Sequence, residues 1–141
     1  MLKGIPKIIS PELLKILDEM GHGDEIVIAD GNFPSANYGK RVIRADAVGG
    51  VKMLDAVLKL IPLDTYAENN FVLMGLSGGD TDIPAIWAEY DKTANVLEKN
   101  VKKATMERFA FYERAKNAYA VIATGEEAVY ANIILKKGVV K

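Results

Sequence analysis

The sequence predicts an α/β domain in which helices cover a β-sheet. Short apolar runs alternate along the chain with segments whose apolar residues recur at helical spacing, and this alternation is typical of sheets packed against helices. Half of the 141 residues are hydrophobic and 26% are charged, a composition that supports one packed core. We therefore expect a single domain over residues 1–141. The order and direction of the strands cannot be read from these patterns.

Four segments have the apolar spacing of helices. The first opens at Ser10-Pro11, because serine can cap a helix and proline suits its first turn. Gly21 is expected to end this helix in a left-handed conformation. The other stripes run from Val51 to Ile61, from Ile83 to Leu97 and from Phe109 to Asn117. Such stripes are more typical of core packing than of a cofactor surface.

Five apolar runs predict strands: Glu25–Ala29, 42–43, 71–76, 118–123 and 132–135. Turn-forming residues follow the first run at 30–35 and the third at 77–81. The second of these loops contains Ser77-Gly78-Gly79-Asp80. It lacks the lysine of a phosphate-binding loop, and Asp80 would repel an anion, so we expect it to cap the following helix.

Composition excludes several classes of function. The net charge is −1 and like charges occur only in adjacent pairs, which argues against nucleic-acid or anionic-membrane partners. The chain has no cysteine, and its single histidine makes a zinc site improbable. No dinucleotide fingerprint is present. Residues 1–6 lack the long apolar run of a secretory signal, so we expect a cytoplasmic protein.

His22 is the strongest candidate for acid–base chemistry. It lies between Gly21 and Gly23, where no neighbouring side chain shields the imidazole, and histidine titrates near neutral pH. A surface or capping role is the simpler interpretation of a single histidine. Asp30 and Asn32 follow the first predicted strand, where polar groups often meet ligands. An Asx turn that introduces the loop explains Asp30 equally well.

Three further groups have two interpretations each. The charges of Arg41, Arg44 and Asp46 around Val42-Ile43 could order a loop or bridge subunits, but a solvated ion-pair face is the simpler interpretation. The aromatic and charged segment 108–114 suits a sugar face or a packed helix interface. Tyr130-Ala131-Asn132 offers neutral donors and acceptors for hydroxyl groups, or a turn before the last strand.

Together these segments resemble the family of fucose mutarotases and ribose pyranases. The resemblance rests on five stretches that follow in order almost from end to end: 9–15, Gly21-His22-Gly23-Asp24, 42–46, 108–115 and 130–139. The Phe33-Pro34 loop with 42–46, and the segment from Arg108 to Ala115, are similar to the fucose branch rather than the ribose branch.

The resemblance implies a cofactor-independent isomerase with a ribose pyranase-like fold, acting on a free monosaccharide such as L-fucose. It also implies a ring-shaped homodecamer with sites at contacts between neighbouring subunits. By matching motifs, His22 would be the catalytic acid/base, Asp30, Arg108, Tyr130 and Asn132 would contact the sugar, and Ala131 would contribute only its backbone.

Mutarotation opens a hemiacetal ring, lets the aldehyde rotate and recloses it on the other face. One proton leaves the anomeric hydroxyl and another reaches the ring oxygen, so neither a metal nor a redox cofactor is required. We expect His22 to supply one transfer; Asp30, Tyr112 or a water molecule could supply the other. The alternatives are a ribose-type pyranase, or a sugar-binding module without catalysis.

Overall fold

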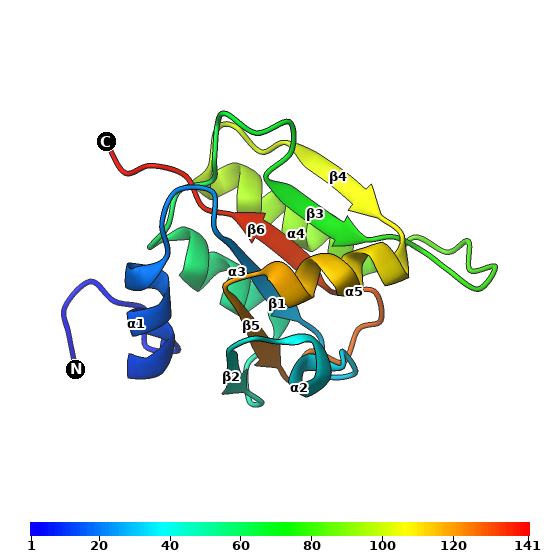
Figure 1. Cartoon of the computed structure of the whole chain (residues 1–141), viewed down its shortest axis with the longest axis horizontal. Helices are drawn as coiled ribbons and strands as arrows, with labels where there is room; N and C mark the ends of the chain where they lie inside the picture. Colours follow the sequence, from blue (N-terminus) through cyan, green and yellow to red (C-terminus); the bar gives the residue numbers. More distant parts are fainter.

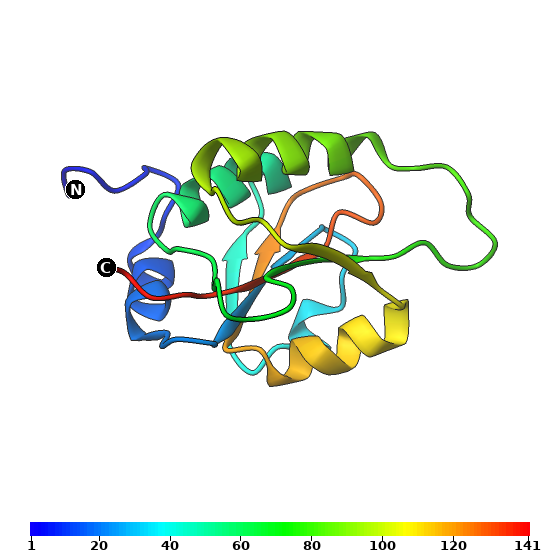
Figure 2. The same cartoon turned by 90° about the horizontal axis from the view of Figure 1, so that it is seen from above.

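The computed structural model describes all residues, 1–141, as a six-stranded sheet between two layers of helices (Figures 1 and 2). The strands lie in the order β2-β5-β1-β6-β3-β4. β6 is antiparallel to its neighbours β1 and β3, and the other paired strands are parallel. The strands are β1 (Glu25–Ala29), β2 (Val42–Ala45), β3 (Phe71–Met74), β4 (Lys103–Met106), β5 (Ala120–Thr124) and β6 (Ile133–Lys136).

Five helices complete the fold, and none of them is long and apolar enough to cross a membrane. In Figure 2, α3 and α4 cover one face of the sheet while α2 and α5 cover the other. The helices are α1 (Pro11–Glu19), α2 (Ser35–Tyr38), α3 (Gly50–Leu58), α4 (Ala85–Leu97) and α5 (Arg108–Asn117).

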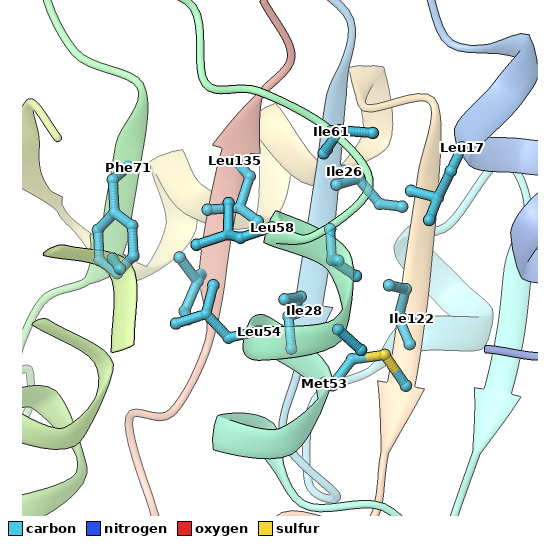
Figure 3. Close-up of a cluster of buried hydrophobic side chains, with 14 of the residues drawn as sticks. Leu17, Ile26, Ile28, Met53, Leu54, Leu58, Ile61, Phe71, Ile122 and Leu135 are labelled. Atoms are coloured by element: carbon cyan, nitrogen blue, oxygen red, sulfur yellow. The ribbon is translucent and has the colours of Figure 1, made fainter. Parts of the chain in front are cut away.

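The core follows the two-residue alternation of the strands. Ile26 and Ile28 of β1 point into the larger cluster, formed with α1, α3 and α4, while Val27 and Ala29 point into the cluster beneath α5. Both faces of β1 are therefore buried, which explains its continuous apolar sequence. The larger cluster surrounds Leu54 and Ile122 (Figure 3).

The predicted fold class is confirmed, with three local differences. Residues 103–106 form strand β4, although their alternately exposed positions include no apolar run that could predict it. Residues 35–38 form one turn of helix that was not predicted. The prediction for Gly21 was wrong: α1 ends at Glu19, Met20 follows it in an extended conformation, and the left-handed residue of this turn is Gly23.

Candidate active site

A cavity of about 300 Å³ opens at the end of the sheet where the strands β1 and β3 finish. Ligands of α/β proteins commonly bind at the carboxyl ends of parallel strands. The volume is at the small end of the range of about 300–1,000 Å³ for ligand pockets, which suits a single sugar ring. Its lining consists of Asp30, Asn32, Phe33, Met74, Ser77, Asp80, Arg108, Tyr112, Val129, Tyr130 and Asn132.

Asp30 is the buried carboxylate of this cavity, with 5% of its surface exposed. Its Oδ1 accepts the Asn32 N–H at 3.0 Å, and its Oδ2 accepts the Ala131 N–H at 3.3 Å. Burial raises the pKa of the Asp30 carboxyl, and these two donors offset only part of that effect. The contact with Asn32 is an Asx turn, so Asp30 both forms the expected turn and lines the pocket.

Asn132 and Ala131, which directly precede β6, hold Asp30 in place. The Asn132 Oδ1 accepts the backbone N–H of Asp30 at 2.8 Å, which leaves the amide nitrogen with only a weak contact to Met74 Sδ at 4.0 Å. Ala131 is fully buried and does not line the cavity. Its carbonyl accepts the Tyr90 hydroxyl at 2.9 Å, so both of its backbone groups are used inside the protein.

Tyr130 connects the cavity to the loop 77–81. Its φ of 55° is left-handed, which is uncommon outside glycine, and its carbonyl accepts the Trp87 indole N–H at 2.8 Å. Its hydroxyl donates to the Ser77 carbonyl at 3.1 Å and also contacts the Asp80 carboxylate. The expectation that this loop caps a helix was wrong, because α4 begins only at Ala85 and has no side-chain cap.

Arg108 reaches the cavity as the first residue of α5. Glu107 fixes the start of this helix by accepting the N–H groups of Phe109 and Ala110 at 3.0 Å. The Arg108 Nε–H donates to the Tyr112 hydroxyl at 3.0 Å, one helical turn away. The remaining guanidinium donors are therefore free to meet hydroxyl groups in the cavity.

His22 lies at the opposite end of the strands, in the turn between α1 and the start of β1 (Figure 1). It is absent from the lining of the cavity that holds Asp30. The two residues flank the five residues of β1, a strand about 16 Å long at about 3.3 Å per residue. Within one chain, the structure brings together Asp30, Arg108, Tyr130 and Asn132 but not His22.

The sequence did not single out Asp64, which contacts the imidazole. The Nε2 of His22 lies 3.0 Å from the Oδ1 of Asp64, and the Tyr66 ring lies beside the imidazole at a centroid distance of 5.5 Å. Asp64 is 42 positions away along the chain, so no local pattern could have paired it with His22.

The apolar walls of the cavity were also missed. Phe33 and Met74 follow or end strands, and their burial resembles ordinary core packing. Val129 is exposed in a loop and carries no signal in the sequence. The ion pair predicted next to Val42-Ile43 is present between Arg44 and Asp46, both exposed to solvent.

Comparisons with known proteins identify the family of this chain. Residues 3–140 match the RbsD / FucU transport protein family. The chain belongs to the RbsD/FucU family. A relative from Mus musculus, named fucose mutarotase, is 53% identical over 145 residues, covering 97% of this chain and 94% of the relative.

Solved structures of RbsD/FucU proteins separate two branches. The fucose mutarotase of Streptococcus pneumoniae, solved in complex with L-fucose, is 51% identical with a TM-score of 0.94, covering 99% of this chain and all of the other. Bacillus subtilis RbsD, solved with D-ribose, covers both chains completely at 26% identity and a TM-score of 0.73. The chain is therefore more similar to the fucose mutarotase than to RbsD, as its segments 33–46 and 108–115 predicted.

Proposed function

We propose that this chain is an isomerase that interconverts the α and β anomers of free L-fucose without a cofactor. The observation that carries the proposal is the cavity itself, where a buried carboxylate, a guanidinium and an amide converge beside apolar walls. Carboxylate, amide and guanidinium groups can bind several hydroxyls of one sugar ring. The relatives named fucose mutarotase, and the neighbour solved with L-fucose, support the same substrate.

The proposed reaction uses two proton transfers. Asp30 accepts the proton of the anomeric hydroxyl while His22, as imidazolium, donates a proton to the ring oxygen and the ring C–O bond breaks. The C1 aldehyde then rotates, and ring closure on its other face returns both protons to their donors. The raised pKa of Asp30 makes it a stronger base than an ordinary carboxylate.

A neighbouring copy of the chain supplies His22 in this proposal. The support is the placement of His22 and Asp30 beyond opposite ends of β1, with His22 outside the lining of the cavity that holds Asp30. His22 is half-exposed, so it can reach into a pocket presented by another subunit.

A contact between the His22 end of one subunit and the Asp30 end of the next is heterologous, and a closed assembly of such contacts is a ring. This agrees with the ring-shaped decamer that the resemblance implies. Large apolar side chains are exposed at both ends: Tyr66 beside His22, and Phe109 and Val129 at or next to the cavity. Their burial between subunits would stabilise such a ring. We place this assembly in the cytoplasm, where free sugars enter metabolism.

The apolar wall favours L-fucose over a pentose. Phe33, Met74 and Val129 would pack against the C5 methyl group of L-fucose, which ribose lacks. One such methyl group changes specificity by about 10- to 200-fold.

Saturation-transfer NMR on free sugars tests the proposal. D-Arabinopyranose has the ring configuration of L-fucose without the C5 methyl group, so the pair isolates that group, and D-ribose tests the pyranase alternative. We expect kcat/KM to be highest for L-fucose and about 10-fold or more lower for D-arabinose. Faster exchange on D-ribose would make the chain a ribose-type pyranase. Binding without exchange above the buffer rate would make it a sugar-binding module.

A further inference from the structure

The His22–Asp64 pair is held together by one short stretch at the end of β6. On one side, the Gly23 N–H donates to the Lys137 carbonyl and the Lys137 N–H donates to the Asp24 carbonyl, both at 2.8 Å. On the other side, the Asp64 N–H donates to the Lys136 carbonyl at 2.9 Å. The two loops that carry the imidazole and the carboxylate are therefore fixed to the same backbone.

Asp64 is built as a buried acceptor. Its side chain is 6% exposed, and its Oδ1 accepts the Tyr66 N–H at 3.1 Å as well as facing His22. The Tyr66 N–H, together with His22, lowers the pKa of the Asp64 carboxyl, so Asp64 is ionised at neutral pH. An ionised carboxylate can only accept hydrogen bonds. The proton of the neutral imidazole must therefore be on Nε2, where it is donated to Asp64.

The other ring nitrogen has the opposite environment. The Nδ1 of His22 makes no hydrogen bond within the chain, and 46% of the side chain is exposed. The Tyr66 ring lies beside the imidazole. The nitrogen that faces outward, toward any neighbouring molecule, is thus Nδ1.

We propose that Asp64 is a positioning residue that keeps His22 in the Nε2–H form, so that Nδ1 exchanges the proton with the sugar. The inference rests on the proposed role of His22. In the acid step, the imidazolium gives its Nδ1 proton to the ring oxygen. It keeps its Nε2 proton, which stays hydrogen-bonded to Asp64. On ring closure, Nδ1 takes the proton back, and Asp64 never changes its protonation.

The single histidine makes this testable without resonance assignment. Protein labelled with ¹⁵N-histidine carries its only imidazole label on His22, and the two ring-nitrogen shifts report which nitrogen holds the proton. For the neutral imidazole of the unaltered protein we expect a protonated Nε2 and a bare Nδ1. Asp64→Asn should move the two shifts toward each other, because an amide can donate as well as accept.

Kinetics supply the second readout. Asp64→Asn should lower kcat by about 10-fold or more, by analogy with the loss of an orienting carboxylate in other His–Asp pairs, with KM for L-fucose unchanged. Asp24→Asn is the matched control, because Asp24 accepts the Gly21 N–H at 2.8 Å in the same turn without contacting the imidazole. It should change neither the shifts nor kcat.

Three results would overturn the inference. These are a proton on Nδ1 in the unaltered protein, an unchanged kcat in Asp64→Asn, or equal losses in the Asp64 and Asp24 variants. The first of these needs no variant, so the inference stays testable even if Asp64→Asn folds poorly. Full anomer exchange by His22→Gln would instead refute the proposed role of His22, and that result is distinct from all three.

Discussion

Asp30 and Asp64 are chemically identical side chains at opposite ends of the strands of one sheet, and 5% and 4% of their surfaces are exposed. Their pKa values nevertheless move in opposite directions. Burial dominates at Asp30, whose contact with the Ala131 N–H is long at 3.3 Å. Hydrogen bonds dominate at Asp64, where the Tyr66 N–H and His22 share one carboxylate oxygen.

This difference suggests two roles for two buried carboxylates. A raised pKa suits a group that takes up and returns a proton, whereas a lowered pKa suits a permanent acceptor that orients another group. In our proposal Asp30 exchanges a proton with the sugar and Asp64 holds the histidine that exchanges the other. Each end of the sheet then carries half of a site, and two copies of the chain are needed to complete one site.

The largest expected effect comes from variants that remove His22 or Asp30, one at each end of the sheet. His22→Gln and Asp30→Asn should each lower anomer exchange by about 10²- to 10⁴-fold, because each removes one proton-transfer group. Co-expression of the two variants should restore activity, since an intact pocket of one variant can meet an intact His22 of the other. With random assembly, about a quarter of the sites would be complete. Saturation-transfer NMR on L-fucose measures the recovery.

Two controls make this experiment decisive. Each variant expressed alone sets the baseline, and the two purified proteins mixed without reassembly should stay at that baseline. If co-expressed variants remain as inactive as the single variants while size-exclusion chromatography finds mixed oligomers, His22 and Asp30 do not meet across a subunit contact.

The second prediction uses the opposite pKa shifts. The raised pKa of Asp30 means that the folded chain binds its proton more tightly than the unfolded chain. Stability therefore falls as pH rises from about 3.9 through the raised value, and at neutral pH the charged carboxylate is unfavourable. The lowered pKa of Asp64 has the reverse effect: it stabilises the fold above about pH 3.9, and this contribution is lost as pH falls through the folded pKa.

The same substitution should thus change stability in opposite directions at neutral pH. Asp30→Asn should raise Tm while abolishing most activity, because it removes the buried charge. Its amide oxygen can still accept the Asn32 N–H, so only the long hydrogen bond from the Ala131 N–H is lost. Asp64→Asn should lower Tm. Thermal unfolding followed by circular dichroism measures both. A decrease in Tm for both variants would mean that hydrogen bonds, not burial, dominate at Asp30.

Much of the fold could be predicted because its apolar patterns are local. Glu25–Ala29 is a continuous apolar run since both of its faces are buried, and Ser10-Pro11 marks a helix start by side-chain chemistry alone. Strand β4 could not be predicted, because it lies at the sheet edge and alternates exposed with half-buried positions. Its only sheet partner is β3, and pairing is a property of the tertiary structure.

The candidate site was predicted unevenly for a similar reason. Asp30 and Asn132 follow or precede strands, so the sequence could place them at a sheet edge. The pairing of His22 with Asp64 depends on two loops meeting at the end of β6, which no spacing along the chain reveals. The resemblance to a family supplied the candidate residues, but it did not show that His22 and Asp30 lie beyond opposite ends of β1.

The smallest expected effect concerns Arg108 on the pocket edge alone. Tyr112→Phe removes the hydroxyl that accepts the Arg108 Nε–H, so the guanidinium loses its fixed orientation. A hydrogen bond to a charged group is stronger than one between neutral groups, but the exposure of Arg108 to solvent weakens this one. We expect KM for L-fucose to rise about 3- to 10-fold with kcat nearly unchanged.

Tyr38→Phe is the matched control for this prediction. The Tyr38 ring packs against Tyr112 at a centroid distance of 4.9 Å, and its hydroxyl does not contact Arg108. The control should therefore keep the KM of the unaltered protein, as measured by anomer exchange at increasing L-fucose concentration. A fall in kcat for Tyr112→Phe at constant KM would point instead to Tyr112 as the second proton-transfer group. It would then replace Asp30 in that role, and the division of labour between the two buried carboxylates would have to be abandoned.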